Sequence, residues 1–171
     1  MQGIPLNERK RLGALLDDRP QAEVMAMIPQ FSQAETDNFV APPAQIPEAL
    51  GVLMFNMERG VNLPEIQEFL RDCPDIQPFD VILANELDDG CARSGNKNTA
   101  RELAQAFGLN CAWGLEFIEL VNDENAKGFH GNAVFSRWPI RRAGVIRLPE
   151  QYNWYFDRQK RIGGRLAVFA E

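Results

Sequence analysis

The stretch FDVILANE, residues 79–86, decides the fold that we expect for this chain. It is a short apolar run that ends in an amide and a carboxylate, and a run of this length is typical of a buried strand. Residues 51–58, GVLMFNME, have the same character, and residues 64–73 carry an apolar helical face that begins at Pro64. We therefore predict two parallel strands joined by a crossover helix at the core of the fold.

Beyond this unit the sequence predicts one more helix and a series of strands. Residues 98–108 form the helix, which Asn98 can cap and Gly108 can end. Short apolar segments then follow as strands, at residues 111–120, 131–137, 143–149 and 163–171. The order of strand, helix, strand, helix and then hairpins predicts an α/β or α+β sandwich with a mixed sheet.

The N-terminal part of the chain has a different character. Residues 6–19 and 21–28 are predicted helices, each followed by a proline. Residues 30–48 are polar and proline-rich, and we expect them to form a loop. The chain is therefore divided into a helical extension and linker, residues 1–48, and a core domain, residues 49–171.

Length and composition are those of one soluble globular domain, with 171 residues of which 45% are hydrophobic. No apolar run is long enough for a signal peptide or a membrane span. Three cysteines without a CxxC pair argue against a disulfide framework and a zinc site, and they favour a reducing, cytoplasmic compartment. The absence of glycine-rich phosphate loops and of GxSxG excludes the commonest nucleotide-binding and serine-hydrolase classes.

Charge is distributed unevenly along the chain, whose net charge is −6. Residues 137–165 hold eight basic side chains against two acidic ones, whereas residues 1–136 hold ten against twenty-one. A basic segment beside an acidic body suits either a phosphate-bearing ligand or a solvated surface. The overall acidity argues against tight, non-specific binding to nucleic acid.

Asn56 and Glu86 are predicted to meet where the two parallel strands end. The C-terminal ends of adjacent parallel strands lie side by side, and ligands bind at that edge of an open α/β sheet. A carboxylate beside an amide suits a hard cation such as Mg²⁺, which takes oxygen ligands. Alternatively, Glu86 caps a loop or pairs with an arginine. Glu58, close to Asn56, is expected to be a loop residue.

Three further residues are candidates for contact with a substrate. His130, the only histidine, lies in GFHGNAVFS and is either a ligand contact or a loop histidine without a task. Asn132 either hydrogen-bonds a ligand or braces the turn. Arg165 follows a double glycine and either holds a phosphate by two bonds or forms a structural salt bridge. Asp88 and Asp89 precede a glycine and are expected to form an ordinary turn.

Taken in order, several segments resemble the exonuclease–endonuclease–phosphatase superfamily, the DNase I-like phosphoesterases. These segments are LMFNMERG, DVILANELDDG, TARELAQAFGL, GFHGNAVFSRWPI and GGRLAVFAE, and the resemblance covers about residues 50–171. It implies part of a four-layer α/β sandwich with a mixed β-sheet, which hydrolyses phosphoesters with Mg²⁺ or Mn²⁺.

The resemblance also implies roles for individual residues. Asn56 would orient the metal ligand or the substrate phosphate, and Glu86, preceded here by an Asn where the family usually has a Gln, would bind the metal. His130 precedes the strand GNAVFSR and would face the scissile phosphate, and Arg165 matches the arginine of a strand that opens with GR. The substrate stays open among nucleic acid, phospholipid and a small phosphoester.

The sequence given stops at Glu171, before the segments that would supply the family's later catalytic Asp, Asn and His. We therefore expect the N-terminal half of such a hydrolase, either truncated or naturally short. A missing C-terminal half or an oligomer partner would cover an apolar sheet face, and the strand residues expected there are Leu53, Phe55, Ile82 and Val134. A chain with this face uncovered is expected to be poorly soluble, oligomeric or marginally stable.

Two other functions remain compatible with the sequence. One is a non-catalytic binding module that keeps the half-fold and uses its surface for a partner. The other is an unrelated α/β nucleotide-binding domain, and the lack of a glycine-rich phosphate loop argues against it.

Overall fold

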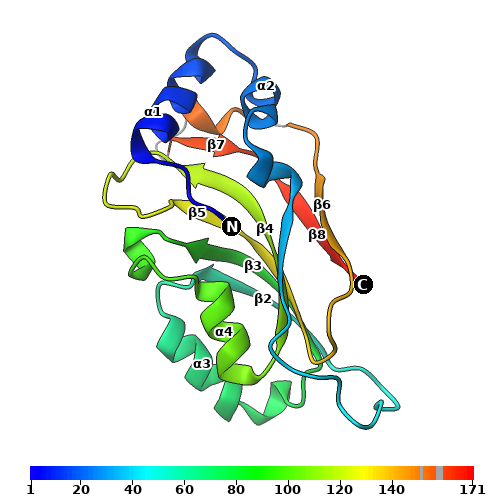
Figure 1. Cartoon of the computed structure of the whole chain (residues 1–171). Coiled ribbons are helices and arrows are strands. Elements are labelled where there is room, and N and C mark those ends of the chain that lie inside the picture. The colour runs from blue at the N-terminus through cyan, green and yellow to red at the C-terminus, as the bar shows by residue number, and fades with distance from the viewer. Residues whose placement is uncertain (151, 157–159) are drawn as a thin grey trace.

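A mixed, six-stranded sheet forms the centre of the molecule (Figure 1). The computed structural model describes residues 1–150, 152–156 and 160–171. Five strands lie in the order β1-β4-β5-β3-β2, and β7 pairs with β4 beside them. The bounds are Ala34–Asp37 (β1), Val52–Arg59 (β2), Val81–Asp89 (β3), Asn110–Glu119 (β4), Phe129–Ser136 (β5) and Arg161–Gly163 (β7). This is the α/β class with a mixed sheet that the sequence predicts.

The predicted crossover unit is present. β2 runs parallel to β3, with Asn56 in register with Asn85, and helix α3 (Leu63–Asp72) connects the two strands. Pro64 lies in the first turn of α3, where its missing N–H costs no helical hydrogen bond. The two strands therefore end at the same edge of the sheet.

A second, two-stranded sheet packs on the main one. It consists of β6 (Ala143–Arg147) and β8 (Leu166–Ala170), which pair antiparallel. The two sheets approach closely at Gly114 of β4, where an added Cβ would lie 2.7 Å from Val145 and 3.0 Å from Val168. Figure 1 shows this small sheet on the side of the main sheet away from α3 and α4.

Helix α4 (Thr99–Phe107) has the ends that the sequence predicts. The side-chain oxygen of Asn98 accepts a hydrogen bond from the N–H of Arg101 at 2.8 Å, and Gly108 follows the helix with φ of +59°. Leu103 of α4 and Leu70 of α3 are fully buried in the core. The two helices thereby cover one face of β2 and β3.

The N-terminal segment packs against the same core. It contains α1 (Leu6–Ala14), η1 (Leu15–Asp17), α2 (Gln21–Ala26) and η2 (Pro29–Ser32). The other 3-10 helices among the described residues are Pro74–Ile76, Ala92–Ser94 and Trp154–Phe156. Residues 30–48 were expected to be a loop, but they include β1, which pairs antiparallel with β4. The polar sequence of β1, AETD, has no apolar pattern, so only its pairing with β4 makes it a strand. None of the described helices is long and apolar enough to cross a membrane.

The apolar side chains left exposed on the main sheet differ from those expected. Most of the expected set packs into the core, namely Leu53, Phe55 and Ile82. The exposed ones occupy the alternate positions and are Val52, Met54 and Leu83. Successive residues of a strand point to opposite faces, so the expectation identified the correct strands but the wrong face. Val134, the fourth expected residue, is half-buried and lines a hollow together with Leu83.

Candidate functional site

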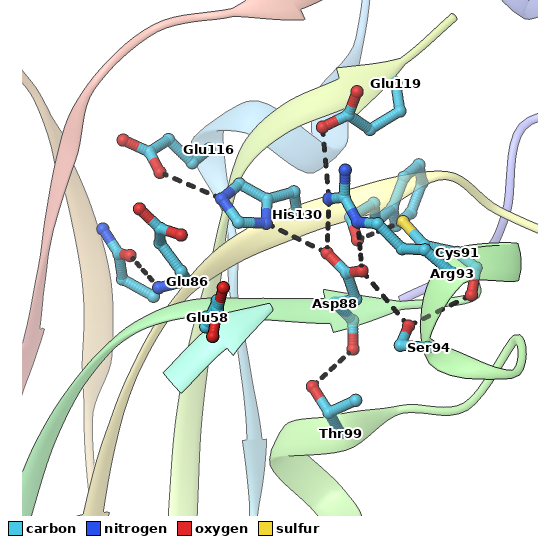
Figure 2. Close-up of polar contacts among 12 residues, drawn as sticks. Glu58, Glu86, Asp88, Cys91, Arg93, Ser94, Thr99, Glu116, Glu119 and His130 are labelled. Carbon is cyan, nitrogen blue, oxygen red and sulfur yellow. Dashed lines mark hydrogen bonds and ion pairs between the residues drawn. The ribbon is translucent and has the colours of Figure 1, made fainter. Parts of the chain in front are cut away.

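The main sheet has three bulges or register irregularities, in the neighbouring strands β2 and β3 and in β4, which β5 separates from β3, and a glutamate lies at each of them. The register shifts after Asn56 in β2, after Ala84 in β3 and after Leu115 in β4. The glutamates are Glu58, Glu86 and Glu116, which we call the bulge row. A bulge inserts an extra residue and changes the direction of the side chains around it. Figure 2 shows the three glutamates on one side of His130.

Glu86, the predicted metal ligand, lies in the bulge of β3. Asn85 and Glu86 together face the single residue Asn132 of β5. The side chain of Asn132 accepts a hydrogen bond from the N–H of Glu86 at 3.2 Å, and Glu86 has φ of +59°. This left-handed conformation costs a non-glycine residue about 1–3 kcal/mol and tends to occur at functional sites. Asn132 therefore braces the bulge, one of the two roles that the sequence left open for it.

Asn56 and Glu58 lie at the end of β2, next to Glu86. The side-chain oxygen of Asn56 accepts a hydrogen bond from the N–H of Glu58 at 2.9 Å, which is the geometry of an Asx turn. Glu58 itself has φ of +46°, so it is held in a tight turn at the strand end. Because Asn56 is in register with Asn85, the neighbour of Glu86, the predicted meeting of Asn56 and Glu86 at one sheet edge is present at the level of the strands.

His130 lies inside β5 and is almost completely buried. Its Nδ1 atom is 3.0 Å from Oδ1 of Asp88, and its Nε2 atom is 3.9 Å from Oε2 of Glu116. The ring also stacks on the ring of Phe117. The sequence suggested a glycine-flanked loop, but Gly131 lies in the strand beside Trp113, where an added Cβ would come within 2.8 Å of the indole. His130 is therefore a buried strand residue, so the expectation of a loop at this position is wrong.

The turn expected at Asp88 and Asp89 is also wrong, since both residues belong to β3 and are buried. Arg93 donates two hydrogen bonds to the Asp88 carboxylate, at 2.7 and 2.8 Å. The hydroxyl of Ser94, which has one proton, lies 3.1 Å from the same carboxylate and 3.0 Å from the carbonyl oxygen of Cys91. Burial alone would raise the pKa of Asp88, but the hydrogen bonds from Arg93 and His130 outweigh it and lower the pKa. Asp88 is therefore a buried, ionised carboxylate. The turn begins one residue later, at Gly90 with φ of +70°.

Glu116 is the site residue that sequence analysis missed. It is the extra residue in the bulge of β4, is 1% exposed, and accepts a hydrogen bond from Nη1 of Arg165 at 3.0 Å. Arg165 thus forms the salt bridge that the sequence left as an alternative, and its guanidinium also lies 5.0 Å from the centroid of the Trp154 ring. A signal for Glu116 was present in the sequence, because this glutamate interrupts the apolar run CAWGLEFIEL, residues 111–120.

The basic segment of residues 137–165 is largely engaged by the chain itself. Its described residues form the ion pairs Arg137–Asp80 (2.9 Å), Arg142–Glu171 (2.7 Å), Arg161–Glu119 (3.3 Å) and Arg165–Glu116 (3.0 Å). Arg147 donates to the backbone carbonyls of Phe31 and Gly164 at 2.9 and 3.1 Å. Arg158 lies outside the described residues. These contacts favour a structural task for the segment over a broad anion-binding surface.

The bulge row offers oxygen donors, the type that Mg²⁺ and Mn²⁺ prefer. Within the described ranges, no group of three or more His, Cys, Asp or Glu side chains is arranged to hold a metal ion. Mg²⁺ commonly takes one or two carboxylates and completes its shell with water and substrate phosphate. Glu86 therefore fits such an ion by donor type, but the described side chains supply only part of its coordination. Cys91 and Cys111 are no alternative, because burial raises the pKa of both thiols.

The chain was compared with family models, with curated proteins and with solved structures, and nothing matched in any of the three.

Proposed function

We propose that the chain is part of a metal-dependent phosphoester hydrolase that binds Mg²⁺ or Mn²⁺ at Glu86. The observation that carries the proposal is the bulge row, which brings three glutamates to the edge where the parallel strands β2 and β3 end (Figure 2). Strained backbone clusters at active sites, and both Glu58 and Glu86 adopt positive φ. That edge is also where open α/β sheets bind their ligands.

Each residue has a defined task in this proposal. Glu86 would bind the ion, Asn132 would fix the direction of Glu86, and Asn56 would orient the ion or the substrate phosphate. When bound, the ion would polarise a phosphate oxygen and stabilise the charge that develops on it. His130 would face the phosphate ester with its Nε2 atom, which points toward Glu116 of the bulge row. Arg165, half-exposed and bonded to Glu116 through one nitrogen, keeps other donors for a phosphate oxygen.

Metal binding tests the role of Glu86 without requiring turnover. We expect the wild type to bind Mn²⁺ saturably, as measured by the electron paramagnetic resonance signal of the free ion. Glu86→Gln should weaken this binding ~10-fold or more, a typical cost of disturbing a metal site. The matched control is Glu65→Gln, which removes the same charge from the exposed first turn of α3. Equal affinities of the wild type and Glu86→Gln would remove Glu86 as a ligand.

Hydrolysis of a generic phosphodiester tests the reaction itself. We expect release of p-nitrophenolate from bis(p-nitrophenyl) phosphate to require Mg²⁺ or Mn²⁺ and to be lost in Glu86→Gln but not in Glu65→Gln. Metal binding without hydrolysis would favour the second candidate, a non-catalytic binding module. The observation that supports this second candidate is the exposed apolar row of Val52, Met54 and Leu83, since an exposed apolar patch marks a partner surface.

A further inference from the structure

Asp88 and His130 form a pair that the proposed metal site does not use directly. They are register partners in the neighbouring strands β3 and β5, and Nδ1 of His130 lies 3.0 Å from Oδ1 of Asp88. Asp88 is fully buried, whereas Glu86, two residues earlier, is only half-buried. The pair is therefore buried and lies beside the bulge row (Figure 2).

The Asp88 carboxylate is clamped by donors from a single short segment. Arg93 donates from Nε and Nη2 in the parallel, two-bond geometry that fixes a carboxylate most tightly, and the hydroxyl of Ser94 approaches the same oxygen as Nε. The backbone carbonyl of Asp88 in turn accepts a hydrogen bond from Thr99 at 2.9 Å. The carboxylate therefore cannot rotate away from His130 without breaking several bonds at once.

Both oxygens of the Asp88 carboxylate accept hydrogen bonds from Arg93, so the nitrogen of His130 at 3.0 Å from Oδ1 lies in the position of a further donor. In a ring that carries one proton, this geometry places the proton on Nδ1 and leaves a lone pair on Nε2. Nε2 points toward Glu116, but the 3.9 Å separation is too long for a hydrogen bond between them. Figure 2 shows Glu116 and Glu86 on the Nε2 side of the ring and Asp88 with Arg93 on the Nδ1 side.

We propose that Asp88 is a positioning residue, which holds the proton of His130 on Nδ1 and so presents the lone pair of Nε2 to the bulge row. There Nε2 accepts a hydrogen bond from a water molecule next to the phosphate ester. The water bound by Nε2 rests on the proposed hydrolase function, whereas the position of the proton on Nδ1 does not. Asp88 acts only through His130, and His130 is the residue that contacts the reacting groups.

Asp89 provides a matched control in the same strand. It is also an aspartate of β3 that is buried, at 3% exposure, and it also has a basic partner, with Oδ2 2.7 Å from Nζ of Lys127. It faces Phe129 in β5 and not His130. Asp88→Asn and Asp89→Asn therefore remove the same charge from neighbouring, similarly buried positions, and only the first touches the imidazole.

Nitrogen NMR of the imidazole tests the positioning directly, because the chain has a single histidine. In the wild type, we expect Nδ1 to show the shift of a protonated nitrogen and Nε2 that of an unprotonated one. Asp88→Asn should move proton population to Nε2, and Asp89→Asn should leave the wild-type pattern. A wild-type ring protonated on Nε2 overturns the proposal without reference to any variant, so it stays decidable even where Asp88→Asn fails to fold.

Kinetics separate this proposal from the proposed function. With Mg²⁺ and bis(p-nitrophenyl) phosphate, Asp88→Asn should lower kcat ~100-fold with little change in KM, and Asp89→Asn should keep kcat, since a positioned proton acceptor contributes to the chemical step. Wild-type kcat in an Asp88→Asn protein whose tautomer has changed would overturn the catalytic use of Nε2 while hydrolysis stands. Absence of hydrolysis in the wild type would overturn the proposed function and the task of Nε2, and the NMR result alone would then decide the role of Asp88.

Discussion

The two halves of strand β3 are built in different ways. From Val81 to Ala84 the strand alternates between covered and exposed positions and pairs regularly with both neighbours. From Asn85 to Asp89 it contains a bulge, a residue with positive φ and two buried carboxylates. Burial of apolar side chains stabilises the first half, and individual charged pairs stabilise the second. The apolar pattern thus determines where the strand runs, and partners that are distant in the sequence determine how it ends.

The largest expected effect on the free energy of unfolding is in the first half of β3, Val81 to Ala84, which we call the regular half. Ile82 is completely buried beneath the helices, so Ile82→Ala should lower the free energy of unfolding by about 4 kcal/mol, through lost burial and the cavity left behind. Urea denaturation followed by tryptophan fluorescence measures this change. A loss below about 1 kcal/mol would mean that the regular half can collapse around the deletion, and the contrast between the two halves would not hold.

The regular half could be predicted because its signals are local. The apolar run of β3, the crossover helix α3 and the ends of α4 at Asn98 and Gly108 each depend on residues within a few positions of one another. β1 could not be predicted in this way. Its sequence AETD has no strand pattern, and its pairing partner in β4 lies far along the chain.

The candidate site could be predicted only in part. Glu86 was identified because it ends an apolar strand, and His130 because it is the single histidine. The bulge that directs Glu86 depends on Asn132, and the task of Asp88 depends on His130, forty-two residues later. A local DDG pattern is typical of a turn, and nothing near it in the sequence indicated a buried carboxylate. Glu116 was visible only as a charged residue within an apolar run.

The second half of β3, Asn85 to Asp89, which we call the polar half, should contribute to a loss of stability in acid, whereas the regular half should not. The pKa of Asp88 in the folded chain lies below its ordinary value of 3.8, so its stabilising contribution is complete above about pH 4 and is lost as the pH falls through the folded pKa. We expect Asp88→Asn to be less stable than the wild type at pH 7 and to lose less stability between pH 7 and pH 3. Urea denaturation at the two pH values measures both. An equal acid loss in the two proteins would show that the Asp88 contacts do not stabilise its ionised form.

A smaller change in the free energy of unfolding, of opposite sign, is expected at the bulge of β3. Glu86→Gly removes a side chain from a positive-φ position that glycine adopts freely, so it should raise the free energy of unfolding by about 1 kcal/mol. The same variant should lose the Mn²⁺ affinity of the wild type. Glu86→Gln is the control, because it removes the charge and keeps the strain, and it should therefore lose affinity without gaining stability. A destabilised Glu86→Gly protein would mean that the carboxylate makes contacts that outweigh the strain.

The smallest effect on stability is expected on the outer face of the regular half. Met54 is 76% exposed and lies on β2 beside the exposed Leu83, so Met54→Lys should change the free energy of unfolding by no more than about 0.5 kcal/mol. It should nevertheless reduce self-association, measured by sedimentation velocity, because a charge on an edge strand opposes pairing with a second copy. A larger loss of stability that depends on protein concentration would show that another copy covers this face in solution. Met54 would then be a buried residue of the contact between copies. Equal self-association of the wild type and Met54→Lys would exclude the exposed apolar row of Val52, Met54 and Leu83 from any contact between copies.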